Sequence, residues 1–362
     1  MMTEQTMISD VAIPPGEFLS EILEEYGMTQ KDLAERMARP PQKINEIIKG
    51  SKAITPETAL QLEQVVGVPA HIWTGMEAEY RLILAKQKEA TSIEEEVACL
   101  ANFPYADLLK LDLVKKTRKA VEKVYSLRTF FAVSSLKNLH DVGQYNPAFR
   151  LSNNDKVSKE AIVSWLRAGS LFASKVDTLP FSKSKLRAIL PELRTLTLEE
   201  EPEVFLTQLQ ERLASAGVAL VLIPHFKKTY VTGATFWESK DKAVILMTFR
   251  GSWADIFWFS LFHEIGHILL HDKRAVFIEG TVMDSSHKKQ EEEADEFARD
   301  CLISAKEYKE FVDGDTFYPC EETITCFAKE VGIHAGIVTG RLQHDDLLHV
   351  SQHVCRVRYK WA

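Results

Sequence analysis

The sequence predicts a mainly helical chain with a small β-sheet in its C-terminal half, which is an α+β fold. Three observations lead to this fold class. Short amphipathic segments fill residues 15–66, apolar residues recur at helical spacing through the middle of the chain, and three short apolar runs precede a long apolar helix. We expect three domains, at residues 1–80, 81–190 and 191–362, which are a helical bundle, a helical connecting region and the domain that holds the sheet.

The composition is that of a soluble globular protein, with 45% hydrophobic and 27% charged residues. No apolar run reaches the roughly 18–20 residues that a membrane span needs, and the first ten residues lack the basic and apolar regions of a signal peptide. The five cysteines are scattered and form no Cys-x-x-Cys pair, as is typical of reduced thiols. We therefore expect a cytoplasmic protein with no membrane partner.

Four helices are expected in the N-terminal domain, at residues 15–26, 29–37, 42–49 and 55–66. Thr29 and Asp32 have the spacing of a capping box at the start of the second helix, and Pro56 suits the first position of the fourth. Two short helices joined by a tight turn are typical of a helix-turn-helix motif, whose second helix enters the major groove of DNA.

Residues 15–80 resemble the Xre/HigA class of DNA-binding antitoxins and repressors, through Pro15-Gly-Glu, Thr29-Gln-Lys-Asp-Leu-Ala-Glu-Arg and Ile44-Asn-Glu-Ile-Ile-Lys-Gly50. By position, the resemblance implies two groups of DNA contacts. The base-reading group is Gln42, Lys43 and Asn45, and the phosphate-binding group is Gln30, Lys49 and Lys52. Pro41 departs from the class, because this position often carries a polar base-reading residue.

The charge of this domain is unevenly distributed. Residues 1–70 carry 6 basic and 11 acidic residues, a net charge of −5, whereas residues 36–52 carry five basic residues against Glu46 alone, a net charge of +4. Because this basic strip coincides with the expected DNA face, we expect a homodimer to bind double-stranded operator DNA over two half-sites. The alternative is a helical protein-interaction module that has lost DNA binding.

The segments that lead up to the sheet contain no motif that carries chemistry. A loop-like stretch rich in Asn, Ser and Asp at residues 138–156 precedes a helix at residues 159–176. An amphipathic helix at residues 197–216 follows. Strands are expected at residues 218–223, 233–237 and 243–249, the last of which precedes the long apolar helix.

That apolar helix, at residues 257–271, contains the pattern His-Glu-x-x-His. His263 and His267 are four residues apart, so they project from one helix face and can bind a single Zn²⁺ ion. Glu264 flanks that face and is the expected general base, which takes a proton from the attacking water. Burying these groups without partners would cost roughly 2–7 kcal/mol for each neutral polar group, and a metal ion removes that problem.

Two further features of this helix carry predictions. Ser252 and Asp255 are spaced as a capping box at its start. Gly266 is costly in a helix interior, which indicates either close packing or the close approach of another backbone.

A third metal ligand is expected from a helix downstream. The inward face of that helix is defined by apolar residues at helical spacing, namely Ala294, Phe297, Ala298, Cys301 and Leu302. Glu291 lies one turn earlier on the same face and is the candidate ligand. Asp295 shares this face and is placed to hold a ligand histidine. Glu292 and Glu293 are expected to lean towards solvent.

His263-Glu-Ile-Gly-His267 followed by Glu291-x-x-Ala-Asp-x-Phe-Ala298 resembles the ImmA/IrrE-type metallopeptidases, which are gluzincin-like regulatory proteases. The resemblance covers residues 193–348. It implies a zincin-like domain, a Zn²⁺ cofactor and regulated cleavage of a repressor or antitoxin protein. Ser304 departs from the family, which commonly has proline at this point.

Two functional readings follow. In the first, the chain is a zinc endopeptidase joined to a DNA-binding domain, and Arg341 and Tyr308 are candidates for stabilising the oxyanion. In the second, it is a non-enzymatic HigA-like antitoxin or transcriptional regulator that uses the zincin-like domain as a sensor or a toxin-binding surface. The presence of Glu264 favours the peptidase, because a purely structural zinc ion has no use for a general base.

Overall fold

The computed structural model describes residues 11–143, 145, 157–248, 253–272, 277–278, 285–314 and 317–359, with backbone only at 285–287. The chain divides into two compact units, Met1–Val97 and Ala98–Ala362. The predicted α+β fold is confirmed, because helices predominate and a four-stranded sheet lies in the second unit. Within the described ranges, no helix is long and apolar enough to cross a membrane.

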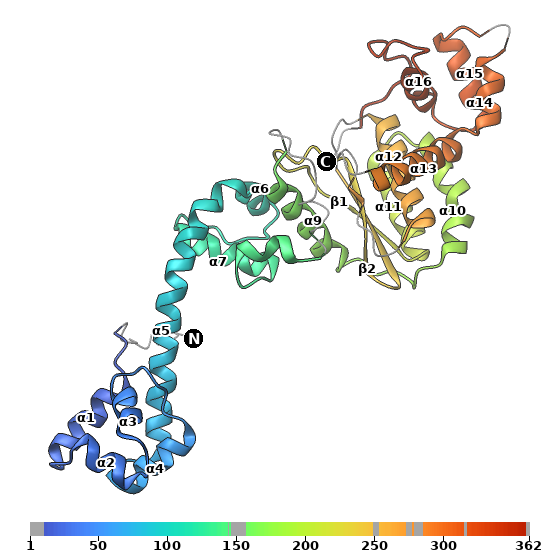
Figure 1. Cartoon of the computed structure of the whole chain (residues 1–362). Helices are drawn as coiled ribbons and strands as arrows, with labels where there is room; N and C mark the ends of the chain where they lie inside the picture. The colour runs from blue at the N-terminus through green and yellow to red at the C-terminus, as the bar shows by residue number, and fades with distance from the viewer. Residues whose placement is uncertain are drawn as a thin grey trace. The chain divides into compact units, whose positions relative to one another are not determined.

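The first unit is a helical bundle (Figure 1). Its helices are α1 (Pro15–Glu25), α2 (Gln30–Arg36), α3 (Pro41–Ile48), α4 (Pro56–Val66) and α5, which runs over Ala70–Cys99. The predicted capping box is present at the start of α2, where the Asp32 backbone N–H donates to the Thr29 hydroxyl at 3.1 Å and the Thr29 N–H donates to the Asp32 carboxylate at 3.0 Å. The pair α2 and α3 forms the helix-turn-helix motif.

Buried apolar side chains from these helices form one core, whose largest members include Leu19, Leu33, Ile44, Leu62 and Trp73. The approach of α1 to α3 is set by Gly16. A Cβ atom on Gly16 would lie 2.2 Å from the carbonyl oxygen of Ile48, so only glycine allows the two backbones to pack this closely.

The second unit begins with helices that precede its sheet. They are η1 (Leu100–Asn102), α6 (Tyr105–Lys110), α7 (Ala120–Phe131), η2 (Leu136–Asp141), α9 (Lys159–Ala173), α10 (Lys183–Thr195), η3 (Leu196–Leu198) and α11 (Pro202–Ser215). The predicted helix at residues 197–216 therefore starts later than expected, at Pro202, which takes the first helical position. Of the predicted loop-like stretch 138–156, residues 144 and 146–156 lie outside the described residues.

The sheet has the strand order β1-β3-β2-β4. The strands are β1 (Val218–Leu222), β2 (Gly233–Ser239), β3 (Lys242–Met247) and β4 (Phe277–Ile278). β1 runs parallel to β3, and β2 is antiparallel to both β3 and β4. The three predicted strands are confirmed, and β4 is an addition that follows the long apolar helix in sequence.

The two faces of the sheet pack against different helices (Figure 1). Ile245 lies in the main core with α12 (Ala254–Leu270) and α11. Leu246 points to the opposite face, because side chains alternate along a strand. There its side chain fills the space beside Gly169 of α9, where an added Cβ would lie 2.3 Å from a Leu246 methyl. The α12 helix therefore packs directly against one face of the sheet.

After α12 and β4 the chain continues through α13 (Ser285–Leu302), α14 (Ala305–Val312), α15 (Glu321–Val331) and α16 (Ala335–His344). Its final described segment returns to the start of α12. Trp253 forms a β-bridge with Arg358, and the Trp258 indole N–H donates to the Tyr359 hydroxyl at 2.7 Å. The segment 353–359 therefore anchors the first turns of α12.

The capping box predicted for α12 is wrong. Trp253 is the N-cap and its side chain makes no capping hydrogen bond, while Ser252 lies outside the described residues. The Asp255 carboxylate instead accepts hydrogen bonds from the Arg356 guanidinium at 3.0 and 2.7 Å. This contact joins residues 101 positions apart, which no local spacing rule can reveal.

Candidate metal centre

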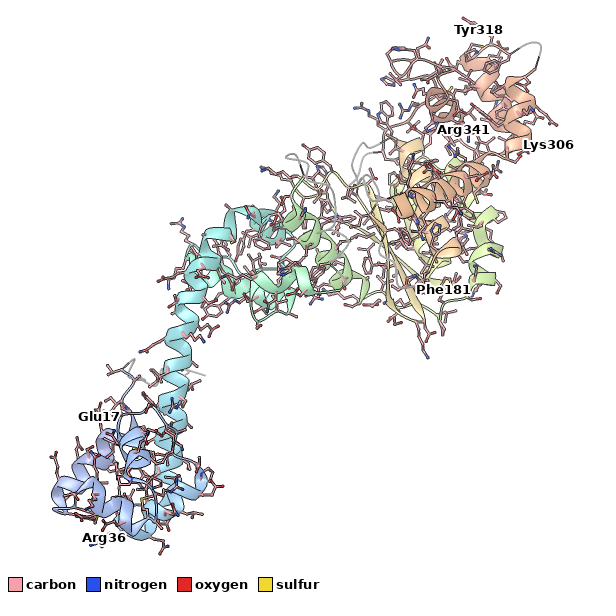
Figure 2. All side chains as sticks on the ribbon, in the orientation of Figure 1. Glu17, Arg36, Phe181, Lys306, Tyr318 and Arg341 are labelled. Atoms are coloured by element: carbon pink, nitrogen blue, oxygen red, sulfur yellow. The ribbon has the colours of Figure 1, made fainter. Side chains whose placement is uncertain are left out.

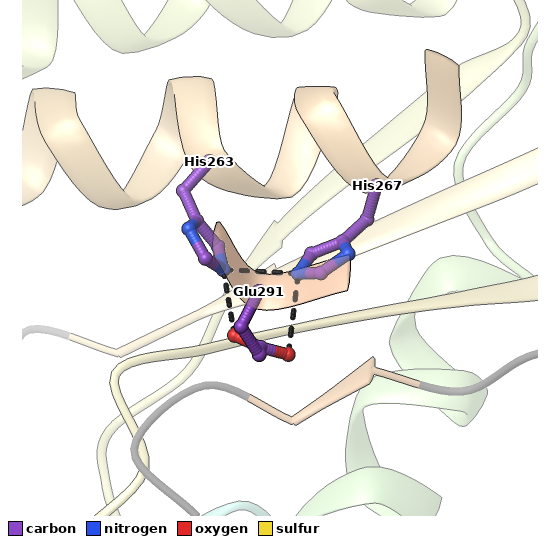
Figure 3. A group of neighbouring side chains, drawn as sticks. All are labelled: His263, His267 and Glu291. Carbon is purple, nitrogen blue, oxygen red and sulfur yellow. Dashed lines mark hydrogen bonds and ion pairs between the residues drawn. The ribbon is translucent and has the colours of Figure 1, made fainter. Parts of the chain in front are cut away.

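α12 presents His263 and His267 from one face, and Glu291 of α13 meets them there (Figure 3). The two Nε2 atoms are 2.9 Å apart. The Glu291 oxygens lie 3.2 Å from His263 Nε2 and 3.5 Å from His267 Nε2. One donor atom from each residue lies within 4.8 Å of the other two. Two imidazoles and one carboxylate that converge in this way can hold a divalent ion such as zinc.

The protonation states of these donors suit a metal ion. Asp295 Oδ1 lies 2.8 Å from His263 Nδ1, and a proton on Nδ1 that is donated to this carboxylate leaves the Nε2 lone pair directed at Glu291. Burial lowers the pKa of His267 to about 4, so its ring is neutral at pH 7. Burial also acts to raise the pKa of Glu291, but its close contacts with His263 and His267 outweigh this effect and lower that pKa to about 2. Neutral imidazoles beside an ionised carboxylate are the metal-binding forms of these groups.

The fold supports both ligand-bearing helices at close range. Gly266 packs against α13, because a Cβ atom there would lie 3.1 Å from the Phe297 ring and 3.3 Å from Ala294 Cα. The close packing predicted for Gly266 is therefore present. It brings α13 near enough to α12 for a side chain as short as Asp295 to reach His263.

A second pair of side chains extends the site beyond His267. His271 Nδ1 lies 3.0 Å from His267 Nδ1, and His271 Nε2 lies 3.1 Å from Glu293 Oε2. Glu292 is exposed as expected. The Glu293 side chain is 43% exposed, and it also makes this contact with His271, which was not predicted. On its other side the His267 ring stacks on Phe277 of β4, with centroids 4.0 Å apart.

The carboxylate of Glu264 is held by strand β2. Glu264 is fully buried, and its Oε2 accepts a hydrogen bond from the Thr235 hydroxyl at 2.5 Å. A Cβ atom at Gly233 would lie 2.5 Å from Glu264 Oε1, so glycine at the start of β2 leaves the space that this carboxylate fills. Neither Thr235 nor Gly233 stood out in the sequence, because no short motif links β2 to α12.

Arg341 and Tyr308 lie side by side on α16 and α14. The Arg341 guanidinium is 4.5 Å from the centre of the Tyr308 ring, and its Nε donates to Asp345 at 2.7 Å. Burial raises the pKa of the Tyr308 hydroxyl. Figure 2 shows Arg341 on α16. Arg341 and Tyr308 thus contact each other, and Arg341 also contacts Asp345. Their role in stabilising an oxyanion stays a prediction.

In the helix-turn-helix motif the six residues expected to contact DNA all remain accessible. Gln30, Gln42 and Lys49 are exposed, and Lys43, Asn45 and Lys52 are partly exposed. Lys43 lies 3.0 Å from Glu46 and is close enough to Lys52 to lower the pKa of that amine. The side chains of Lys43 and Lys52 therefore place positive charges close together on the surface of α3 and the turn after it.

Comparison with known families agrees with both halves of this description. Residues 19–73 match the helix-turn-helix family. Residues 221–315, which run from the end of β1 through the other three strands, α12, α13 and α14, match the IrrE N-terminal-like domain of peptidase family M78. The chain joins a helix-turn-helix domain to an IrrE-type domain. Both resemblances inferred from the sequence are thereby confirmed, and the chain couples a DNA-binding regulator domain to a domain of a peptidase family.

Individual relatives cover the helix-turn-helix domain. Virulence-associated protein I of Dichelobacter nodosus is 39% identical over 77 residues, which are 21% of this chain and 71% of that protein. The uncharacterised HTH-type transcriptional regulator YddM of Escherichia coli K12 is 27% identical over 73 residues, 20% of this chain and 78% of that protein. Among solved structures, a HigA-family addiction module antidote from Coxiella burnetii is 31% identical, with 24% of this chain and 94% of that chain covered and a TM-score of 0.22.

Proposed function

We propose that the IrrE-type domain is a zinc-dependent endopeptidase that cleaves a protein substrate, namely a repressor or an antitoxin. The observation that carries this proposal is the convergence of His263 Nε2, His267 Nε2 and a Glu291 oxygen within 4.8 Å of one another, beside the buried carboxylate of Glu264. His263, His267 and Glu291 would hold the ion, and Asp295 would hold the His263 ring in its metal-binding orientation.

Each side chain of this site has a distinct task. A bound zinc ion supplies Lewis acidity, which polarises a peptide carbonyl and lowers the pKa of water. Glu264 takes a proton from the attacking water and returns it to the nitrogen of the leaving amine. The Thr235 hydroxyl, 2.5 Å from Glu264 Oε2, fixes the direction from which that carboxylate acts. The fully buried position of Glu264 keeps competing bulk water away from its carboxylate.

For the helix-turn-helix domain we propose binding of a homodimer to operator DNA. Gln42, Lys43 and Asn45 would read base edges, and Gln30, Lys49 and Lys52 would bind phosphates. The family match over residues 19–73 and the accessible basic strip support this assignment. Because this domain is joined to the proposed peptidase, one chain would combine operator binding with proteolysis.

The decisive experiment compares the wild-type protein with Glu264→Gln. Both are stripped with a chelator, reloaded with zinc and incubated with a lysate of the source cells, and newly formed protein N-termini are labelled and sequenced by mass spectrometry. We expect a small set of new N-termini with the wild type, and none with Glu264→Gln or with the metal-free protein. Glu292→Gln is the matched control, because Glu292 is an exposed carboxylate of α13.

The result also separates the two readings of this chain. If Glu264→Gln produced the same N-termini as the wild type, Glu264 would not be the general base. If the zinc-loaded wild type produced none from any lysate, the non-enzymatic antitoxin with a sensor or toxin-binding surface would replace the peptidase. The substrate itself is identified by the protein that accumulates on Glu264→Gln, which binds without cleaving.

A further inference from the structure

A basic segment leads into α7, in the second unit. Residues 115–123 carry five basic residues against Glu122 alone, a net charge of +4, whereas the whole chain has a net charge of −8. Lys115, Lys116 and Arg118 are exposed and form no ion pair with any residue that the structure describes. These residues belong neither to the metal centre nor to the helix-turn-helix motif, so the functions proposed above leave this concentration of charge unexplained.

Hydrogen bonds fix the backbone of the basic segment without using its cationic groups. The Lys115 N–H donates to the Ser126 hydroxyl at 2.8 Å, and the Lys115 carbonyl accepts a hydrogen bond from the Tyr105 hydroxyl at 2.6 Å. Further along the segment, the Lys119 N–H donates to the Thr117 hydroxyl at 3.2 Å. A surface that is ordered in advance loses less conformational entropy when a partner binds, so this segment is well prepared to bind an anionic partner.

The acidic residue of the segment is neutralised within the segment itself. The Glu122 carboxylate accepts a hydrogen bond from the Thr117 hydroxyl at 2.5 Å and lies 3.1 Å from Lys119 Nζ. Glu122 therefore does not offset the three exposed cations, which remain available to a partner from outside.

The partner that suits this surface is the phosphate backbone of double-stranded DNA. Duplex DNA carries one negative charge about every 1.7 Å along its axis, and proteins bind its phosphates through Lys and Arg side chains and through helix N-termini. The segment supplies the cations, and α7, which begins at Ala120, adds the positive end of its helix dipole. The same chain carries a helix-turn-helix domain at residues 19–73. Because residues 1–70 have a net charge of −5, further cations elsewhere in the chain would offset the repulsion of DNA by that domain.

We propose that residues 115–119 and the first turn of α7 form a second DNA-binding surface, which binds phosphates without reading the base sequence. This inference rests on the proposed function of the helix-turn-helix domain, because that domain would bring the duplex to the chain. Both surfaces belong to one chain, so binding at one raises the effective concentration of the duplex at the other. The basic segment would strengthen binding to every sequence alike, while the helix-turn-helix motif selects the operator.

Removal of the three exposed cations tests this surface. The triple variant Lys115→Gln, Lys116→Gln and Arg118→Gln is compared with the wild type by fluorescence anisotropy at several salt concentrations. The two probes are a promoter fragment and a scrambled duplex, each of about 60 base pairs, or about 200 Å. Loss of three phosphate contacts should flatten the slope of log K against log salt by about 2.7, which is roughly 0.9 for each contact. The variant should bind both duplexes at least about tenfold more weakly at low salt, and its preference for the promoter should be unchanged.

A second triple variant controls for the change in total charge. Lys306→Gln, Lys309→Gln and Lys329→Gln removes three exposed lysines from α14 and α15, in a stretch where residues 306–330 carry three basic and seven acidic residues. Its net charge equals that of the first variant, but it should keep the affinity and the salt slope of the wild type. Thermal unfolding verifies that both variants are folded.

The outcomes separate this inference from the proposed operator binding. If the first variant kept the wild-type slope, the basic segment would not bind DNA, whatever the helix-turn-helix motif selects. If the wild type bound both duplexes equally, operator recognition would fail, and a flattened slope in the first variant would still support the second surface. Equal flattening in both triple variants would show that only total charge matters, which would overturn the second surface. No binding of either duplex at low salt would contradict both proposals.

Discussion

The imidazole of His271 faces that of His267, with their Nδ1 atoms 3.0 Å apart, and its opposite nitrogen lies 3.1 Å from Glu293. A histidine that binds a metal through one ring nitrogen is usually oriented by a hydrogen bond to the other. For His263 this partner is a carboxylate, Asp295. For His267 it is a second histidine, which Glu293 holds in place in turn.

We predict that His271→Phe and Glu293→Gln each weaken zinc binding by roughly 10- to 100-fold while the protein stays folded. The aromatic ring of Phe retains the packing of His271 but cannot orient His267. Competition with a chromophoric zinc chelator measures the affinity. Glu296→Gln on α13 is the control, because Glu296 is exposed. An unchanged zinc affinity in both variants would mean that His267 is oriented by its stacking on Phe277 alone.

Thr235→Val should lower kcat by roughly tenfold without changing zinc affinity. The substitution keeps the shape of the side chain but removes the hydroxyl that donates to Glu264 Oε2, so the general base loses its orientation and not its charge. Thr235→Ser should retain most of the rate. Steady-state kinetics on the substrate identified by the Glu264→Gln protein provides the measurement, and equal rates for the Val and Ser variants would contradict the role of the hydroxyl.

The metal-free protein should lose stability as the pH falls from about 6.5 to about 4. Burial lowers the pKa of His267 from 6.5 to about 4 in the folded chain, so within this window the unfolded chain binds a proton that the folded chain does not. The free energy of unfolding therefore falls with falling pH, by at most about 1.4 kcal/mol per pH unit.

Urea unfolding in the presence of a chelator at pH 7, 6 and 5 measures this effect. The comparison is with His267→Phe, in which the contribution of this ring is absent. A difference in unfolding free energy between the two proteins that stays constant across these pH values would show that His267 does not titrate as its burial requires.

Arg356→Ala should destabilise the second unit by about 3–5 kcal/mol, because it leaves the Asp255 carboxylate in a buried position without its counter-ion. Both side chains of this pair are only 9% exposed. Arg358→Ala is the matched control, since Arg358 also stacks on Trp253 but is exposed. The double variant Asp255→Asn with Arg356→Ala should lose less than the sum of the single losses, and strict additivity in urea unfolding would rule out the coupling.

The helix-turn-helix domain should bind its promoter with a strong dependence on salt. Lys49→Ala should weaken binding to all duplexes alike and flatten the salt slope by roughly 0.9, whereas Gln42→Ala should weaken binding to the cognate site by about 1–3 kcal/mol. Lys31→Ala, outside the basic strip, is the control. Anisotropy titrations of a promoter fragment and a scrambled duplex at two salt concentrations test this, and an absence of binding at low salt would make the domain a protein-interaction module.

The features that sequence reasoning found are those with local causes. The start of α2 follows from the capping pair Thr29 and Asp32, and the position of Glu291 follows from the apolar stripe of α13. Both depend on residues within one or two helical turns of each other. The same holds for β1, β2 and β3, which are short apolar runs with turn residues between them.

The features that it missed depend on contacts between distant segments. β4 has two residues, too few for any periodic pattern. Glu293 has the same local surroundings as Glu292, and only the crossing of α12 by α13 determines which of the two meets His271. The pairing of Asp255 with Arg356, and of Glu264 with Thr235, likewise requires the tertiary structure to be known.

The anchoring of α12 by residues 353–359 also has a kinetic consequence. The contacts of Arg356 with Asp255 and of Tyr359 with Trp258 each span 101 residues of chain, and contacts between distant segments form slowly because a long loop must close first. We therefore expect the sheet to assemble before the first turns of α12 are fixed. Until then the helix that carries His263 and His267 would not be fixed in place. Zinc uptake, followed in real time during refolding, would therefore report one of the last steps in the folding of this unit.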